Sequence, residues 1–214
     1  MAVTTGFSEP YIAKYSNTGT TVSYSGGMKL GRGVSMSVEV ESADDNNFFA
    51  DDQIAESETG IMTSASGTFT VDGLEPEAAA LILGLPEKGS ETIKETPVDV
   101  YDYDDRMAAP YVGVGVLRRV MMKGVTTWEP IVFTKVKFNI PGDEAATQEG
   151  QINWQTQDLD ASIVRDDTEN HRWKRVFARQ KTKAAALAII KGYLKITEPE
   201  SVAAKQEEGG SHEI

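Results

Sequence analysis

The side chains that could do chemistry in this 214-residue sequence are clustered carboxylates and two histidines, because the chain contains no cysteine. Without cysteine there is no disulfide framework, no thiolate zinc site and no cysteine nucleophile. His171 lies in a charged stretch and His212 in a polar C-terminal stretch, and neither has a partner at the spacing of a metal site. We therefore expect both histidines to be exposed.

The carboxylates occur in solvated runs. Asp102, Asp104 and Asp105 are the best enzymatic candidates, yet a general acid needs an apolar pocket that raises its pKa. Residues 44–47 have the composition of a calcium loop, but they lack alternate-position ligands, a central glycine and a terminal bidentate Glu. We expect no catalytic, cofactor-binding or metal-binding residues, and therefore no enzyme.

The net charge of −12 is unevenly distributed. Residues 1–105 carry 19 Asp/Glu and 5 Lys/Arg, whereas residues 106–214 carry 14 Asp/Glu and 16 Lys/Arg. Nine of these 16 basic residues lie within residues 165–195. One interpretation is a solubilising acidic surface. The other is a self-associating subunit with one acidic and one basic face. Either way, an acidic chain is a poor candidate for tight DNA binding, which depends on neutralising phosphates.

Length and composition are those of one globular domain. No apolar run approaches the roughly 20 residues that cross a bilayer, and the first residues do not resemble a signal peptide. We expect a single domain over residues 1–197, with a long loop (42–65) and an N-terminal arm (1–28) that docks late, docks on a neighbouring molecule or frays. A flexible polar tail should follow at residues 198–214.

Two strands with one exposed face flank the long loop. Residues 34–41 alternate Val or Met with Ser or Glu, and residues 66–72 repeat the alternation. The polar positions are Ser35, Ser37, Glu39, Glu41, Thr68, Thr70 and Asp72. Because a two-stranded ribbon is not stable alone, we expect copies of the same chain to complete this sheet.

The loop of residues 42–65 is too long and too polar for a hairpin turn, and such loops are usually functional or disordered. Its acidic and apolar residues are Asp44, Asp45, Phe48, Phe49, Asp51, Asp52, Ile54, Glu56 and Glu58. Burial would stabilise each phenylalanine by roughly 1.5–3 kcal/mol. We expect this loop to contact another protein, mobile in the monomer and ordered on assembly.

A short helix should follow, opened by Pro76 and closed by Gly84. The apolar face of this helix consists of Ala78, Leu81, Ile82 and Leu85. It should cover the apolar side of the two strands, which includes Val34. The remaining elements are strands at residues 97–103, 111–123, 125–140, 151–158 and 173–177, and a helix at 182–191.

Two of these strands carry specific expectations. Gly113 and Gly115 indicate a face that another backbone approaches closely. In the 125–140 strand, one face should carry Val132, Thr134, Val136, Phe138 and Ile140, and the other Lys135 and Lys137. The 151–158 strand should close the sheet and pair with the 125–140 strand as a second wide hairpin.

The order of these elements resembles the major tail tube protein of long-tailed, non-contractile bacteriophages. The likeness rests on the strand GTFTVDGL (67–74), the Ala-rich helix ending in GLP (84–86), and WEPIVFTKVKF (128–138) followed by QINWQT (151–156). It covers about residues 6–196, and the family has no catalytic signature. The resemblance implies a mainly β fold, a β-sandwich or partial barrel with one or two flanking α-helices and a long inter-strand loop.

The resemblance also implies a structural virion protein without a cofactor, made in the bacterial cytoplasm. Six subunits would form a ring, and rings would stack into the tail tube, a conduit for DNA ejection into the host cell. The implied partners are further copies of the chain, a tape-measure protein, a tail terminator and distal tail or tip proteins. Genomic DNA would pass through without specific binding, and no membrane is involved.

Carried onto this sequence, the polar positions of the two strands would line the channel, and the 42–65 loop would reach a neighbouring subunit or ring. Lys135 and Lys137 would make the channel mixed in sign if they point inward. A basic region would meet the acidic half across the ring joint, and its residues are Arg165, Arg172, Lys174, Arg175 and Arg179. The alternative is an all-β adhesin that presents the acidic loop to a ligand.

Overall fold

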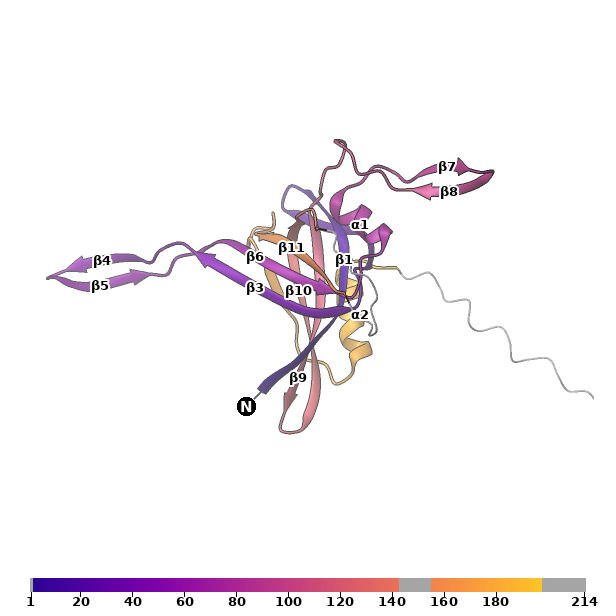
Figure 1. Ribbon diagram of the computed structural model, residues 1–214. Helices are drawn as coiled ribbons and strands as arrows, with labels where there is room; N and C mark the ends of the chain where they lie inside the picture. The colour runs from indigo at the N-terminus through magenta and orange to yellow at the C-terminus, as the bar shows by residue number, and fades with distance from the viewer. Residues whose placement is uncertain (1, 143–154, 198–214) are drawn as a thin grey trace, which may run out of the picture.

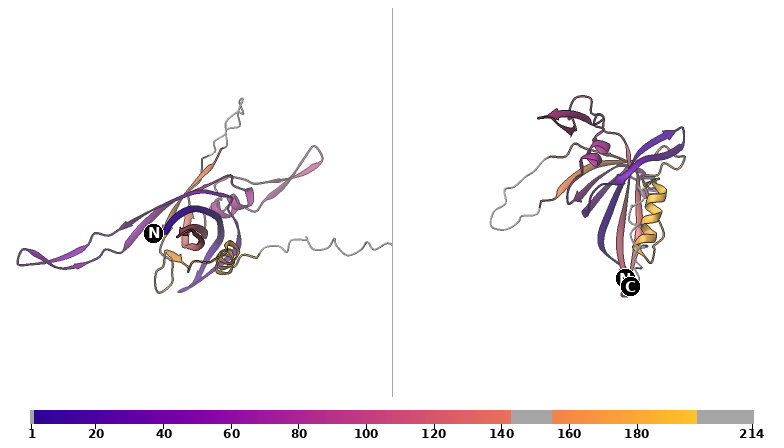
Figure 2. Two further views of the ribbon diagram at one scale, coloured as in Figure 1. Left: turned by 90° about the horizontal axis from the view of Figure 1, so that it is seen from below. Right: turned by 90° about the vertical axis from the view of Figure 1, so that its right-hand side faces the viewer.

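The computed structural model describes residues 2–142 and 155–197, and it is mainly β with two flanking α-helices, as expected (Figure 1). The main sheet contains β1 (Ala2–Thr18), β2 (Thr21–Lys29), β3 (Gly33–Ser42), β6 (Met62–Val71), β9 (Val112–Met122), β10 (Val125–Phe138), β11 (Gln157–Val164) and β12 (Lys174–Val176). The order is β2-β1-β9-β10-β11-β6-β3, with β12 also paired to β10. The sheet curls, as the view from below shows (Figure 2), and Phe7 of β1 comes to lie against Gly33 of β3.

The N-terminal residues are part of this sheet and not a loosely attached arm. β1 pairs antiparallel with β2 on one side and with β9 on the other. Its buried residues include Tyr11, Ile12 and Tyr15. Residues 1–28 therefore form strands of the sheet and not the predicted arm, because this apolar cluster packs against the chain's own core.

The helix α1 (Pro76–Leu83) begins at Pro76 and ends at Gly84, whose φ of 62° is the left-handed conformation that favours glycine. Its buried residues are Ala78, Ala79, Ile82 and Leu83, so the buried face is rotated from the predicted one. Leu81 and Leu85 still contact the core around Phe69, but they are only partly buried. Val34 is 52% exposed, because β3 lies at the edge of the sheet.

The second helix, α2 (Lys183–Tyr193), begins after Thr182, whose hydroxyl accepts a hydrogen bond of 3.2 Å from the Ala185 amide. It contributes Ala186 and Ile190 to a second apolar cluster. The close approach at Gly113 and Gly115 comes from side chains and not, as predicted, from a backbone. Added Cβ atoms there would meet three side chains, those of Tyr24, Ile190 and Leu194.

The predicted alternation in β10 is interrupted. The register shifts between Phe133 and Val136, so Ile131 and Phe133 share one apolar cluster with Val136, while Val132 lies in the other. A strand that is buried on both faces has a continuous run of apolar residues. Its sequence therefore does not show which side chains share a face, and the predicted faces of β10 were wrong for this reason. Ile140, expected on the inner face, is 71% exposed beyond the end of the strand.

Several element boundaries also differ from the predictions. Residues 151–154 of the predicted 151–158 strand lie outside the described residues, and the observed strand β11 begins at Gln157 and pairs with β10. The predicted 97–103 strand is β8 (Thr96–Val100), which forms a separate hairpin with the unpredicted β7 (Gly89–Ile93). The short basic strand at 173–177 is confirmed as β12. In the described part of the chain, neither helix is long and apolar enough to cross a membrane.

Candidate functional site

One face of β3, β6 and β11, here called the polar sheet face, carries hydrogen-bonded polar side chains. Residues directly opposite one another in antiparallel strands point to the same side. The register aligns Ser37 with Thr68 and Asp160 in one row, and Ser35 with Thr70 and Asp158 in the next. Hydroxyls and carboxylates therefore run in rows across three strands.

Hydrogen bonds tie these rows together. Thr68 and Thr70 donate hydrogen bonds of 2.7 Å to Asp160 and Asp158, respectively. Ser35 donates to Thr70 at 2.9 Å. Because all of these acceptors keep free lone pairs toward solvent, the face is ordered and still wet.

The predicted polar positions mostly lie on this face. Ser35, Ser37, Glu39 and Glu41 are exposed, and Thr68 and Thr70 are half-buried. Asp72 differs, because it follows β6 and makes an ion pair of 2.7 Å with Arg32, which neutralises its charge. Asp158 and Asp160 were not among the predicted residues of this face, although their alternation with Leu159 and Ala161 indicates a strand with one exposed face.

The two lysines behave differently. The register runs from Glu39 through Ser66 and Ser162 to Lys137, so Lys137 lies on the polar sheet face. Lys135 makes an ion pair of 2.7 Å with Asp167, and its side chain is mostly buried. Its ammonium also lies near the rings of two tyrosines, Tyr15 and Tyr111. The polar sheet face is therefore mixed in sign but mainly acidic.

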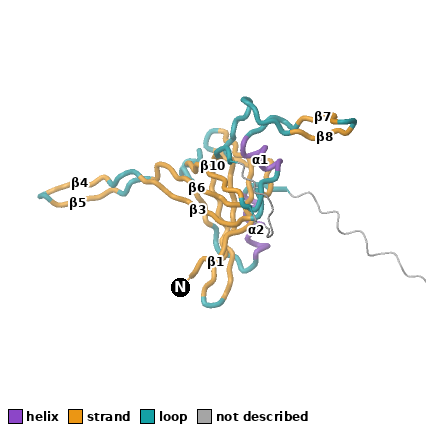
Figure 3. Tube along the Cα trace, in the orientation of Figure 1, coloured by secondary structure: helices purple, strands orange, loops and turns teal. Residues whose placement is uncertain are grey.

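The predicted 42–65 loop is a β-hairpin, which corrects the expectation of irregular structure. β4 (Asn46–Ala50) pairs with β5 (Gln53–Glu58) around a turn formed by Asp51 and Asp52 (Figure 3). Both aspartates have positive φ, 51° and 59°, as the tight two-residue turns of hairpins require. From here on, the ribbon β4–β5 is called the arm; it is distinct from the N-terminal arm predicted for residues 1–28.

The arm projects from the body (Figures 1 and 3), and every residue of its two strands is exposed. Phe48 is 63% exposed, Phe49 62%, and Ile54 is similarly open. The predicted acidic residues of the loop all lie in or beside the arm, and residues 33–71 contain no Lys or Arg. An acidic ribbon with exposed aromatic rings has the composition of a contact surface.

The second hairpin, β7–β8, projects on the opposite side of the body (Figures 1 and 2). All of its residues except Val100 are exposed, and Ile93 is its most exposed large apolar side chain. At its base, Lys88 makes an exposed ion pair of 2.8 Å with Asp99. The molecule therefore extends two ribbons in opposite directions.

The predicted basic region is largely engaged within the chain. Arg175 lies over the rings of Phe177 and Tyr193. Lys174 lies over two further rings, and burial, with Arg118 nearby, lowers its pKa. Arg165 is exposed and remains available for a contact.

Arg179, the fourth side chain of this region, belongs to an internal ion cluster. Its Nε donates a hydrogen bond of 3.0 Å to the buried carboxylate of Glu129, and Arg118 pairs with the other oxygen. Burial acts to raise the pKa of Glu129, but the hydrogen bonds from the two guanidinium groups outweigh it, and the pKa is lowered. The cluster joins β9, β10 and the segment after β12. The remaining predicted basic residue, Arg172, uses its backbone amide to donate to Asp166 at 2.9 Å.

The carboxylates that were the best enzymatic candidates do not form an acid–base pair. Asp104 accepts hydrogen bonds from the side chain and backbone of Arg106, which lower its pKa. Within residues 2–142 and 155–197, no group of three His, Asp or Glu side chains is placed to hold a metal ion. The sequence matches no protein-family model, and a comparison with curated proteins finds no match either.

Proposed function

We propose that this chain is the subunit of a hollow polymer, the tail tube of a bacteriophage with a long non-contractile tail. The observation that carries the proposal is the arm, which leaves Phe48 and Phe49 in water. Burial would stabilise each ring by roughly 1.5–3 kcal/mol, and the arm projects away from its own body. Contact with another copy of the chain supplies that burial.

The directions of the two ribbons support a ring. The arm and the β7–β8 hairpin project to opposite sides, so each subunit can touch a neighbour on both sides through different surfaces. Such a head-to-tail contact closes into a ring when its rotation divides the circle evenly. β3 also ends the strand order of the main sheet, and edge strands of this kind are usually covered or paired.

The polar sheet face supports a channel. Its hydroxyls and carboxylates would repel the phosphate backbone of DNA, so that DNA passes without binding. Lys137 lies among them and keeps the bore from being uniformly negative. In this proposal the protein resides in the virion tail, assembles around a tape-measure protein, and meets terminator and tip proteins at its ends.

Electron microscopy of the purified protein tests the proposal. We expect rings or tubes, whereas discrete particles would favour the adhesin that presents the acidic arm to a ligand. Deletion of residues 46–58 should leave a folded monomer that no longer polymerises, because β4 and β5 pair only with each other among the described strands. Unchanged tubes after this deletion would remove the arm from assembly.

A further inference from the structure

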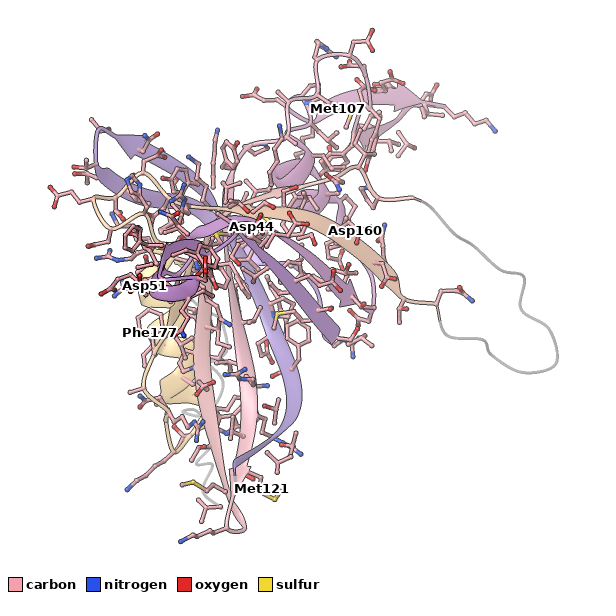
Figure 4. All side chains as sticks on the ribbon, turned by 90° about the vertical axis from the view of Figure 1, so that its left-hand side faces the viewer. Asp44, Asp51, Met107, Met121, Asp160 and Phe177 are labelled. Carbon is pink, nitrogen blue, oxygen red and sulfur yellow. The ribbon has the colours of Figure 1, made fainter. Side chains whose placement is uncertain are left out.

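The two ends of the molecule carry complementary surfaces. The β9–β10 turn and the start of β1 form one end, and α1 lies toward the other (Figure 1). Figure 4 shows Met121 at the first end and Met107, in the segment that follows β8, at the second. The long axis between these ends is roughly perpendicular to the two projecting ribbons.

The first end, here called the tip, is an exposed apolar surface built from three paired strands. The register places Val3 opposite Met121, and Val125 opposite Met122. All four side chains are exposed, and Val125 is 63% exposed at the turn. Apolar groups from three strand segments thus gather where the sheet runs out into solvent.

The second end contains a hollow of about 520 Å³ beside α1. Its apolar lining comes from α1, the segment after β8 and the end of β10, and includes Leu83, Val100, Tyr103 and Ile140. Tyr103 is 61% exposed and Ile140 71%, which is unusual for residues beside a core helix. The hollow is open to solvent, and polar side chains, including Asp99 and Gln157, also line it.

The charges around the two surfaces are opposite. The tip strands contribute Arg119 and Lys123, whereas Arg118 is already paired with the buried Glu129. Residues 72–105, which supply most of the lining of the hollow and the β7–β8 hairpin, carry ten Asp or Glu and two Lys, a net charge of −8. Opposite charge around matching apolar surfaces orients an encounter and excludes tip-to-tip and hollow-to-hollow contacts.

We infer that the tip of one copy inserts into the α1 hollow of the next copy along the long axis. The inference deepens the proposed tube function, on which it rests, by naming the surfaces that stack one ring on another. Because the two surfaces differ and lie at opposite ends, the contact repeats without closing. In this arrangement the arm and the β7–β8 hairpin make the contacts that close each ring.

The absence of native cysteine makes a direct test simple. The double variant Val125→Cys, Ile140→Cys places one thiol at the tip and one at the hollow. Under mild oxidation in assembled material we expect a ladder of covalent multimers on denaturing gels, since a disulfide requires a close approach of the two backbones. The matched control, Val125→Cys with Ser37→Cys on the polar sheet face, should remain monomeric.

The outcomes separate this contact from the proposed function. Tubes without the Val125–Ile140 ladder, or with an equal ladder in the control, would overturn the stacking contact and leave the tube proposal standing. A wild-type protein that forms no polymer would overturn both.

A charge exchange provides the second readout if the cysteine variant assembles poorly. Lys123→Glu should reduce sedimentable polymer about tenfold, and adding Asp102→Lys in the same chain should restore it. Loss without any restoration would count against the contact.

Discussion

Thr68 on β6 donates a hydrogen bond of 2.7 Å to Asp160 on β11, across the face that would line the bore. Thr70 makes the same contact with Asp158 one row along. The two hydrogen bonds hold a pair of carboxylates in fixed positions on a surface that is otherwise hydroxyl-rich. The negative charges of Asp158 and Asp160 therefore occupy fixed positions on the polar sheet face.

Reversing that pattern should make the tube retain DNA. The double variant Asp158→Lys, Asp160→Lys should keep its fold within about 1 kcal/mol, because exposed hydrogen bonds contribute little to stability. Assembled material should then bind double-stranded DNA at about 50 mM salt and release it near 200 mM. Fluorescence anisotropy measures this, with Asp158→Asn, Asp160→Asn as the control. Equal retention by the lysine variant and the wild type would contradict the assigned role.

Replacing both arm phenylalanines with serine should separate folding from assembly. Phe48→Ser, Phe49→Ser should change the free energy of unfolding by no more than about 0.5 kcal/mol, since both rings are already in water. Polymer should nevertheless be lost in sedimentation assays. Phe69→Ala, in the core, should instead cost roughly 3–5 kcal/mol in urea unfolding. A large loss of monomer stability in the arm variant would mean that the rings are buried within their own chain.

Adding one methyl group under α2 should destabilise the protein. In Gly115→Ala the new Cβ would meet Ile190 and lie 3.0 Å from Leu194, so the helix must shift. We expect a loss of about 1–3 kcal/mol, seen as a fall in Tm of several degrees. Gly73→Ala, where no atom lies within 4 Å of the added Cβ, should leave the Tm nearly unchanged. Equal effects of the two variants would show that α2 does not press on β9.

The Glu129 cluster should give the protein a specific acid sensitivity. The folded-state pKa of Glu129 lies below its usual value of 4.5. Its contribution to stability is therefore fully present above pH 4.5 and is lost as the pH falls through the lowered pKa. Glu129→Gln should reduce stability by roughly 1–3 kcal/mol near neutral pH. The difference in Tm between the two proteins should shrink from pH 5 to pH 3, and a constant difference over that range would contradict this assignment.

Sequence patterns predicted the elements of the centre of the fold well. The alternation in β3 and β6 and the proline and glycine that bound α1 are local signals, and the structure follows each of them. The exposed face of β3 was predicted for the same reason, because the alternation of polar and apolar residues indicates which side of a strand is exposed to solvent.

The errors came from long-range packing. β10 is buried on both sides, so its apolar run could not reveal the register shift at Phe133. The arm and the β7–β8 hairpin were missed because their turns use Asp51, Asp52, Lys94 and Glu95 at positive φ, where Asn-Gly or Asp-Gly is the usual signal. Asp158 and Asp160 reach the polar sheet face only through the pairing of β11 with β6.

The position of β1 has a consequence for folding. The second half of β1 pairs with the nearby β2, but its first residues pair with β9, and Thr5 bonds to Arg119, 114 residues further along the chain. Contacts of such long range slow folding. At the usual rates of translation Arg119 is added several seconds after Thr5. The first residues of β1 are therefore open to wrong pairing until β9 has been made.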